Sequence, residues 1–124
     1  MYNLLLVDDE RFLTHAMTRL LRHDEYAIYT AADAVEAQHV LKTRPIDLIV
    51  SDQKMPGMSG VELFGWAAKY FPNTIRILLT GWPSIGNVDE PINDTHVDRF
   101  FMKPCDYDKL RSAIQQELRS RPIV

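Results

Sequence analysis

Short runs of apolar residues alternate along this chain with longer segments in which apolar residues recur every three or four positions. The short runs are rich in leucine and β-branched residues, which is typical of strands that are buried on both faces of a parallel sheet. The longer segments have the period of amphipathic helices. The pattern therefore predicts an α/β domain of five strand–helix units, with helices covering both faces of one five-stranded parallel sheet.

The expected strands are short, and each is followed by a segment of different period. They cover residues 3–7, 26–30, 47–51, 75–79 and 99–102. The first helix follows the first strand, and its apolar positions are Phe12, Leu13, Ala16, Met17, Leu20 and Leu21. The second helix ends before Pro45, and the positions that line one of its sides are Val35, Ala37, Val40 and Leu41.

The third helix has the clearest start signal in the sequence. Ser59 is followed three residues later by Glu62, which predicts a capping box, and the apolar positions expected to be buried are Val61, Phe64, Ala68 and Phe71. Residues 107–118 form the last amphipathic helix, with Leu110, Ala113, Ile114 and Leu118 facing inward. Between the last two strands, residues 85–97 include Gly86 and Pro91, so any helix there is expected to be short or distorted.

Composition and charge narrow the class of protein. With 124 residues, of which 46% are hydrophobic, we expect one domain covering residues 1–124. The formal charge of −3 is spread over interspersed residues, which argues against direct binding to nucleic acid or to a membrane surface. No apolar run is long enough for a membrane span, and the N-terminus is not typical of a signal peptide. Cys105 is the single cysteine, which is consistent with a reducing, cytoplasmic location.

Polar side chains follow four of the predicted strands, at the edge where a parallel sheet binds its ligands. Asp8 and Asp9 follow the first strand, Asp52 the third, Thr80 the fourth and Lys103 the fifth. With strand order 2-1-3-4-5, the first and third strands are neighbours and the three carboxylates converge. Because like charges this close repel one another, the cluster must bind protons or a cation, and Mg²⁺ is the cation that best suits such oxygen ligands.

The other two residues at this edge suggest what the cluster does. A lysine ammonium and a threonine hydroxyl together suit the oxygens of a phosphoryl group that is being transferred. A carboxylate can act as the nucleophile that accepts such a group. Asp52 is the candidate, because the turn-rich sequence after it, QKMPGMSG, exposes the end of its strand.

Four motifs make the sequence resemble the receiver domain of two-component response regulators. They are LLLVDDE at 4–10, VSDQKMPGMSG at 50–60, LLTG at 78–81 and FMKP at 101–104, and the resemblance covers almost the whole chain. It implies a flavodoxin-like fold and a phosphoryl group that Asp52 accepts from the phosphohistidine of a sensor histidine kinase or a histidine phosphotransfer protein. It also implies Mg²⁺ bound by Asp9, Asp52 and the backbone carbonyl of Lys54, with Asp8 acting through water.

The resemblance assigns roles to the remaining site residues as well. Thr80 and Lys103 match the family's phosphate-contacting hydroxyl and lysine, and Phe100 matches its aromatic switch position. Phosphorylation is then expected to change the surface formed by the fourth helix, the fifth strand and the fifth helix, and so to alter binding to an output domain or a second copy of the chain. Such a protein is a signalling switch that catalyses its own phosphotransfer and dephosphorylation, rather than a metabolic enzyme.

Other functions remain open on the sequence alone. A receiver-like adaptor would bind partners without ever being phosphorylated. A Mg²⁺-dependent hydrolase of the haloacid dehalogenase type also uses a strand-end aspartate, but it would need a second aspartate where this chain has Lys54. A flavin-binding flavodoxin would need a phosphate-binding loop after the first strand, where Asp8 and Asp9 would repel a phosphate.

Overall fold

The computed structural model describes residues 1–81, 96–103 and 106–120. At its centre is a five-stranded sheet with the order β2-β1-β3-β4-β5, in which every neighbouring pair is parallel. The strands are β1 (Asn3–Val7), β2 (Ala27–Ala31), β3 (Leu48–Asp52), β4 (Ile75–Gly81) and β5 (Arg99–Lys103). The predicted architecture and strand order are therefore confirmed, with strand ends that differ from the prediction by one or two residues.

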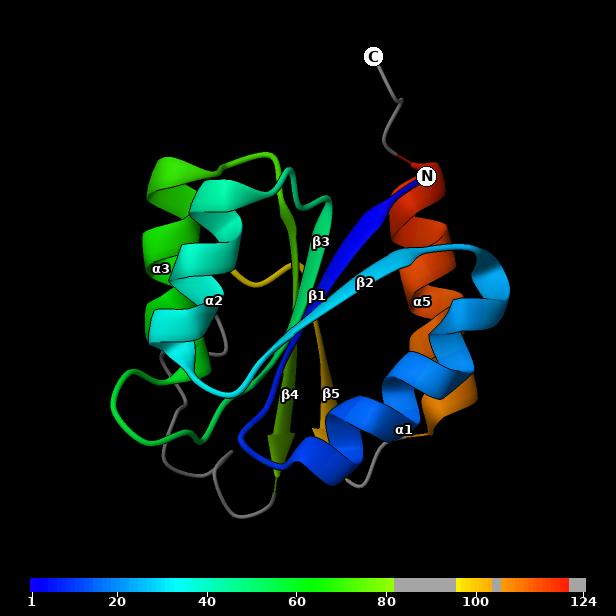
Figure 1. The fold of residues 1–124 in the computed structure, drawn as a ribbon, viewed down its shortest axis with the longest axis horizontal. Coiled ribbons are helices and arrows are strands. Elements are labelled where there is room, and N and C mark those ends of the chain that lie inside the picture. Colours follow the sequence, from blue (N-terminus) through cyan, green and yellow to red (C-terminus); the bar gives the residue numbers. More distant parts are fainter. Residues whose placement is uncertain (82–95, 104–105, 121–124) are drawn as a thin grey trace.

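Helices cover both faces of this sheet (Figure 1). The helical elements are α1 (Arg11–Leu21), the 3₁₀ turn η1 (Arg22–Asp24), α2 (Ala34–Thr43), α3 (Gly60–Tyr70) and α5 (Tyr107–Arg119). Helices α2 and α3 lie on one face, and α1 and α5 lie on the other. Of the helices described here, none has the length and apolar character needed to cross a membrane. Most of the predicted weak segment at 85–97 lies outside the described residues, which resume at residue 96.

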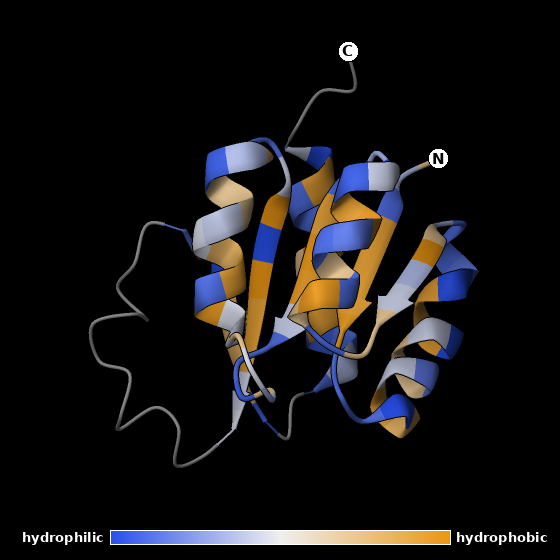
Figure 2. Cartoon of the chain, turned by 60° about the vertical axis from the view of Figure 1, so that its left-hand side comes forward, coloured by the Kyte–Doolittle hydropathy of each residue, from blue (hydrophilic) through white to orange (hydrophobic). Residues whose placement is uncertain are grey.

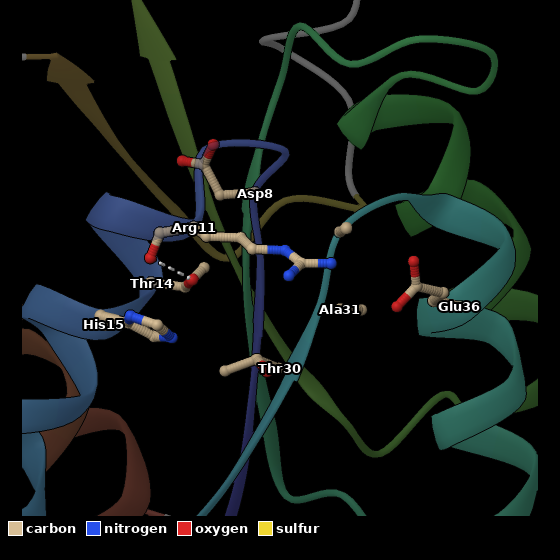
Figure 3. A pocket seen from close by; sticks show the side chains of 8 residues that line it. Asp8, Arg11, Thr14, His15, Thr30, Ala31 and Glu36 are labelled. Atoms are coloured by element: carbon tan, nitrogen blue, oxygen red, sulfur yellow. Dashed lines mark hydrogen bonds between the residues drawn. The ribbon is translucent and has the colours of Figure 1, made fainter.

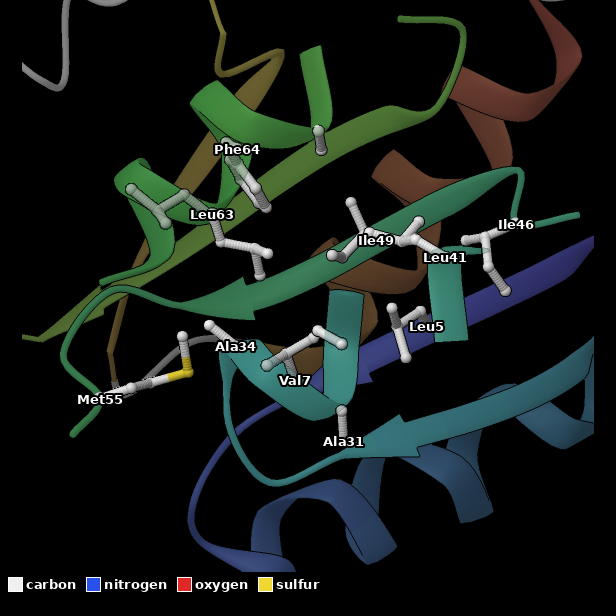
Figure 4. Packing of buried hydrophobic residues seen from close by; sticks show 13 residues of the cluster. Leu5, Val7, Ala31, Ala34, Leu41, Ile46, Ile49, Met55, Leu63 and Phe64 are labelled. Carbon is white, nitrogen blue, oxygen red and sulfur yellow. The ribbon is translucent and has the colours of Figure 1, made fainter. Parts of the chain in front are cut away.

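The core has two layers because the sheet is buried on both faces. Along β1, Leu4 and Leu6 pack on the α1 and α5 side, whereas Leu5 and Val7 pack on the α2 and α3 side. Figure 2 shows the resulting hydrophobic strands between helices with hydrophilic outer faces. Figure 4 shows the layer on the α2 and α3 side, in which side chains from the strands pack against those of the two helices. This two-sided burial explains why the strands appear in the sequence as continuous apolar runs.

Two apolar positions of the helical pattern are exposed rather than buried. Val35 is 74% exposed and Phe12 is 81% exposed. Asp33 caps α2 by accepting a hydrogen bond from the Glu36 amide at 2.8 Å, so the helix begins at Ala34. The buried positions of α2 are then Ala34, Ala37 and Leu41. Val35 is one residue, or about 100°, away from that stripe, so the expectation that it lines the buried side is wrong.

Helix α3 begins as predicted. The Glu62 amide donates to Ser59 Oγ at 3.2 Å, and the Ser59 amide donates to Glu62 Oε1 at 3.1 Å, which completes the capping box. Its fully buried positions are Gly60, Leu63, Phe64 and Ala67, whereas the expected Val61, Ala68 and Phe71 are half-buried. The box fixes the point at which the loop after β3 returns to the sheet.

Candidate functional site

Three carboxylates meet at the C-terminal edge of the sheet. Asp8 and Asp9 follow β1, and Asp52 ends β3, which is the neighbour of β1. One oxygen from each of the three lies within 4.8 Å of the others. Asp8 and Asp52 are buried and Asp9 is exposed. At this separation two ionised carboxylates repel each other by about 3 kcal/mol at a protein-like dielectric constant, so the cluster attracts positive charge.

Lys103 supplies part of that charge from β5. Its Nζ lies 2.9 Å from Asp8 Oδ2 and 3.3 Å from Asp52 Oδ1. Three carboxylates paired with one ammonium leave a deficit of two positive charges. The donor set consists of hard carboxylate oxygens, so the residues present suit a divalent ion such as Mg²⁺. Lys54, whose backbone carbonyl the family resemblance implies as a ligand of the metal, follows Asp52 by two positions in the loop after β3.

Thr80 lies in β4, between the strands that carry Asp52 and Lys103. It is fully buried, and its hydroxyl oxygen has no hydrogen-bond partner among the described residues. A buried polar group without a partner typically costs about 1–3 kcal/mol. Strand β4 was expected to end before Thr80, but it continues to Gly81, so Thr80 is fixed in the sheet. The hydroxyl is therefore an unused hydrogen-bond donor near the C-terminal end of β4.

Burial and neighbouring charges shift two of the titrating groups. Burial raises the pKa of the Asp52 carboxyl, and nearby Asp8 and Asp9 raise it further, against the lowering effect of Lys103. For Lys103, burial opposes the charged form, but the hydrogen bond to Asp8 and the charges of Asp52 and Asp8 outweigh it and raise the pKa. The raised pKa of Asp52 shows that its surroundings disfavour the charged carboxylate despite the contact with Lys103, and such shifts are frequent at functional sites.

The aromatic residues and the cysteine singled out in the sequence are not part of the carboxylate cluster among the described residues. Phe100 lies on β5 and is 40% exposed, while its neighbour Phe101 packs against the α1 and α5 layer. Trp66 is half-buried and its ring lies 5.6 Å from that of Phe71. Trp82 and Cys105 lie outside the described residues.

A small polar hollow next to Asp8 is not apparent from the sequence. It has a volume of about 190 Å³ and lies between α1, the end of β2 and α2. Figure 3 shows Arg11 extending from α1 across the hollow toward Glu36 of α2, with His15 one turn along α1. The spacing of Arg11 and His15 places them on one side of a helix, but nothing in the sequence indicates that the facing element is α2.

Comparisons with known proteins agree with this geometry. The transcriptional regulatory protein GlrR of Escherichia coli is 34% identical over 118 residues, which cover 94% of this chain and 26% of that protein. Sporulation initiation phosphotransferase F of Bacillus subtilis is 25% identical over 115 residues, which cover 93% of this chain and 92% of that protein. This chain spans about a quarter of the length of the first curated relatives that it matches.

The solved structures include several with the same fold. The response regulator TrrA of Thermotoga maritima, in complex with Mg²⁺ and BeF, superposes with a TM-score of 0.83 at 28% identity, covering 94% of this chain and 98% of that one. A family model described as the response regulator receiver domain matches residues 4–115. The resemblance carried by the four motifs is thereby confirmed, and this chain belongs to the response regulator receiver domain family of two-component signalling.

Proposed function

We propose that Asp52 is the residue of this receiver domain that accepts a phosphoryl group. The observation that carries the proposal is the contact between Asp52 Oδ1 and Lys103 Nζ at 3.3 Å, together with the unpartnered buried hydroxyl of Thr80 on β4, the strand that lies between those of Asp52 and Lys103. Three neighbouring parallel strands then supply a nucleophilic oxygen, a hydrogen-bond donor and a cation at the same end of the sheet. These are the groups that stabilise charge on a transferring phosphoryl group.

The donor is a phosphohistidine of a sensor histidine kinase or a histidine phosphotransfer protein. An Asp52 oxygen forms the new bond to phosphorus while the bond between phosphorus and the imidazole nitrogen breaks, and the imidazole keeps the electron pair of that bond. Lys103 and Thr80 contact the phosphoryl oxygens. Water later attacks the aspartyl phosphate, which releases inorganic phosphate and restores the carboxylate.

Mg²⁺ is the metal proposed for this site. Asp9, Asp52 and the backbone carbonyl of Lys54 would hold it, and Asp8 would act through water. When bound, the ion would neutralise negative charge on the carboxylates and on the phosphoryl oxygens. Asp8 keeps Lys103 at the site through its 2.9 Å contact, so the ammonium is already in place before a phosphoryl group arrives.

The proposed output is a change in the surface that includes β5 and α5. Thr80 and Lys103 both contact the phosphoryl group in this proposal, and they lie on adjacent strands, with Thr80 opposite Met102 and Gly81 opposite Lys103. A movement of Thr80 toward the phosphoryl group would allow Phe100, now 40% exposed, to change position. The consequence is an altered affinity for an output domain or a second copy of the chain.

The test is intact-mass analysis after incubation with a small acyl phosphate and Mg²⁺. We expect one phosphoryl group on the wild type and none on Asp52→Asn. Asp33→Asn is a matched control, because asparagine can still cap α2 and Asp33 is not part of the carboxylate cluster. Incorporation into Asp52→Asn at the wild-type level would exclude Asp52. Failure of the wild type to accept phosphate from either the acyl phosphate or a phosphohistidine donor would instead favour an adaptor that is not phosphorylated.

A further inference from the structure

Gln53, the residue after Asp52, is buried and forms hydrogen bonds in two directions. It is 7% exposed. Its backbone amide donates to the carbonyl of Leu79 at 2.8 Å, next to Thr80 on β4. Its side-chain Oε1 accepts from the Val61 amide of α3 at 2.9 Å. One residue therefore links the strand that carries Thr80, the phosphoacceptor and the start of α3.

The first turn of α3 depends on Gln53 as much as on its own capping box. The amides at the start of a helix have no partner within the helix and need acceptors from elsewhere. The Gly60 amide donates to the Gln53 carbonyl at 3.0 Å, and the Val61 amide donates to the Gln53 side chain. Ser59 supplies the acceptor for the third, the Glu62 amide. Residue 53 thus satisfies two of these amides with its main chain and its side chain.

The helix also approaches the Asp52 backbone directly. A Cβ atom added to Gly60 would lie 2.5 Å from the Asp52 carbonyl oxygen and 2.7 Å from Leu78 Cδ1, so only glycine allows this approach. Met55, within the same loop, is buried in the core. Residues 53–60 consequently form a loop whose two ends are joined by hydrogen bonds between Gln53 and the start of α3, and Lys54 is the first residue inside that loop.

We propose that Gln53 is a positioning residue of the phosphoryl-transfer site. By accepting from the Val61 amide, its side chain holds residues 52–54 against α3, which fixes the orientation of the Asp52 carboxylate and of the Lys54 carbonyl. The residue does not touch the phosphoryl group or the metal; it acts through its two chain neighbours. This inference rests on the proposed function of Asp52.

The experiment compares two variants that each remove one acceptor from the same helix start. Gln53→Leu leaves the Val61 amide without its acceptor, and Ser59→Ala leaves the Glu62 amide without its side-chain acceptor. We expect similar losses of thermal stability from the two. We expect Gln53→Leu alone to weaken Mg²⁺ binding roughly tenfold, the equivalent of about 1.4 kcal/mol, measured by calorimetric titration with Mg²⁺. Gln53→Glu keeps an acceptor for Val61 and should bind Mg²⁺ at least as tightly as the wild type.

A second measurement separates positioning from helix stability. Phosphorylation by an acyl phosphate at saturating Mg²⁺ should be slower for Gln53→Leu than for Ser59→Ala, and Gln53→Glu should restore the rate. If the wild type binds Mg²⁺ and is phosphorylated but Gln53→Leu equals Ser59→Ala in affinity and rate, the positioning role is wrong and Asp52 keeps its function. If Gln53→Leu does not fold, Gln53→Glu decides: a weak affinity or slow rate in that variant overturns the role. Absence of phosphorylation in the wild type overturns both proposals.

Discussion

Asp24 and Asp52 each pair with a basic side chain from the C-terminal part of the chain, but their surroundings shift their pKa values in opposite directions. Asp24, in η1, accepts from Arg111 Nε and Nη2 at 2.7 and 2.8 Å and from Gln115 at 3.3 Å. These hydrogen bonds, first among them those from Arg111, lower the pKa of its carboxyl. Asp52 is more deeply buried and shares the Lys103 ammonium with Asp8, and burial raises the pKa of its carboxyl.

The difference is the one expected between a structural ion pair, at Asp24, and the reactive pair proposed at Asp52. Around Asp24, donors meet both carboxylate oxygens, so the pair ties η1 to α5 and leaves no unmet charge. Around Asp52, the carboxylate cluster carries more negative than positive charge, and the hydroxyl of Thr80 on the adjacent strand β4 has no partner among the described residues. In the proposed function, this site gives up stability in the resting protein in exchange for affinity for a cation and a phosphoryl group.

The largest expected effect comes from removing the cation of each pair. Lys103→Met should slow phosphoryl transfer to Asp52 roughly 100-fold or more, because the phosphoryl group being transferred loses the fixed positive charge that stabilises it. Arg111→Met should leave that rate unchanged and lower the free energy of unfolding, since Asp24 loses its bidentate partner. The rates are measured with an acyl phosphate at saturating Mg²⁺. Equal phosphoryl-transfer rates in Lys103→Met and Arg111→Met would show that Lys103 is no more involved in the reaction than Arg111.

Neutralising the carboxylates should change stability in opposite directions. Without Mg²⁺, Asp52→Asn should raise the free energy of unfolding by about 0.5–2 kcal/mol, because a buried, repelled charge is removed. Asp24→Asn should lower it, because the charge that Arg111 pairs with is removed. Chemical denaturation of both variants beside the wild type measures the two changes. A loss of stability in Asp52→Asn would contradict the view that the resting site is electrostatically unfavourable.

The pH dependence of these changes should also differ. The folded pKa of Asp52 lies above its unfolded value of about 3.9, so the cost of its charge is fully present above the folded pKa and disappears as the pH falls toward 3.9. The advantage of Asp52→Asn should therefore shrink over that range. The folded pKa of Asp24 lies below about 3.9, so its contribution is fully present above that pH and is lost only as the pH falls through the lower value.

Sequence reasoning succeeded where a feature depends on neighbouring residues or on strand order. The capping box of Ser59 and Glu62 is a local signal, and it forms as predicted. The meeting of Asp8, Asp9 and Asp52 follows from parallel strands in the order 2-1-3-4-5, which brings β1 beside β3. Their roles in binding Mg²⁺ and accepting phosphate remain predictions.

Features that depend on side-chain packing between elements were not predictable in this way. Val35 is exposed because Asp33 caps α2 and so determines which positions of the helix face the sheet. In the sequence, an apolar residue next to the buried stripe cannot be distinguished from one that belongs to it. The link from Gln53 to Val61 joins a strand end to a helix start, and a glutamine in a turn-rich loop gives no sign of it. Phe100 could be assigned to a position in the family but not to an inward or outward orientation.

The smallest expected effect separates the two neighbouring aspartates in Mg²⁺ binding. Asp9→Asn should weaken Mg²⁺ about threefold more than Asp8→Asn, a difference of ~0.7 kcal/mol. Asp8 already accepts from Lys103 at 2.9 Å and from the Glu10 amide at 2.9 Å, whereas Asp9 is exposed and has no hydrogen bond or ion pair among the described residues. Both substitutions remove one negative charge, so the long-range attraction for Mg²⁺ falls similarly, and the excess loss in Asp9→Asn reports direct coordination.

Calorimetric titration with Mg²⁺ measures the difference between the two affinities. Asp24→Asn is a charge-matched control that should bind Mg²⁺ like the wild type. Equal losses in the two variants would contradict the assignment of Asp9 to direct coordination, and a larger loss in Asp8→Asn would place Asp8 rather than Asp9 against the metal.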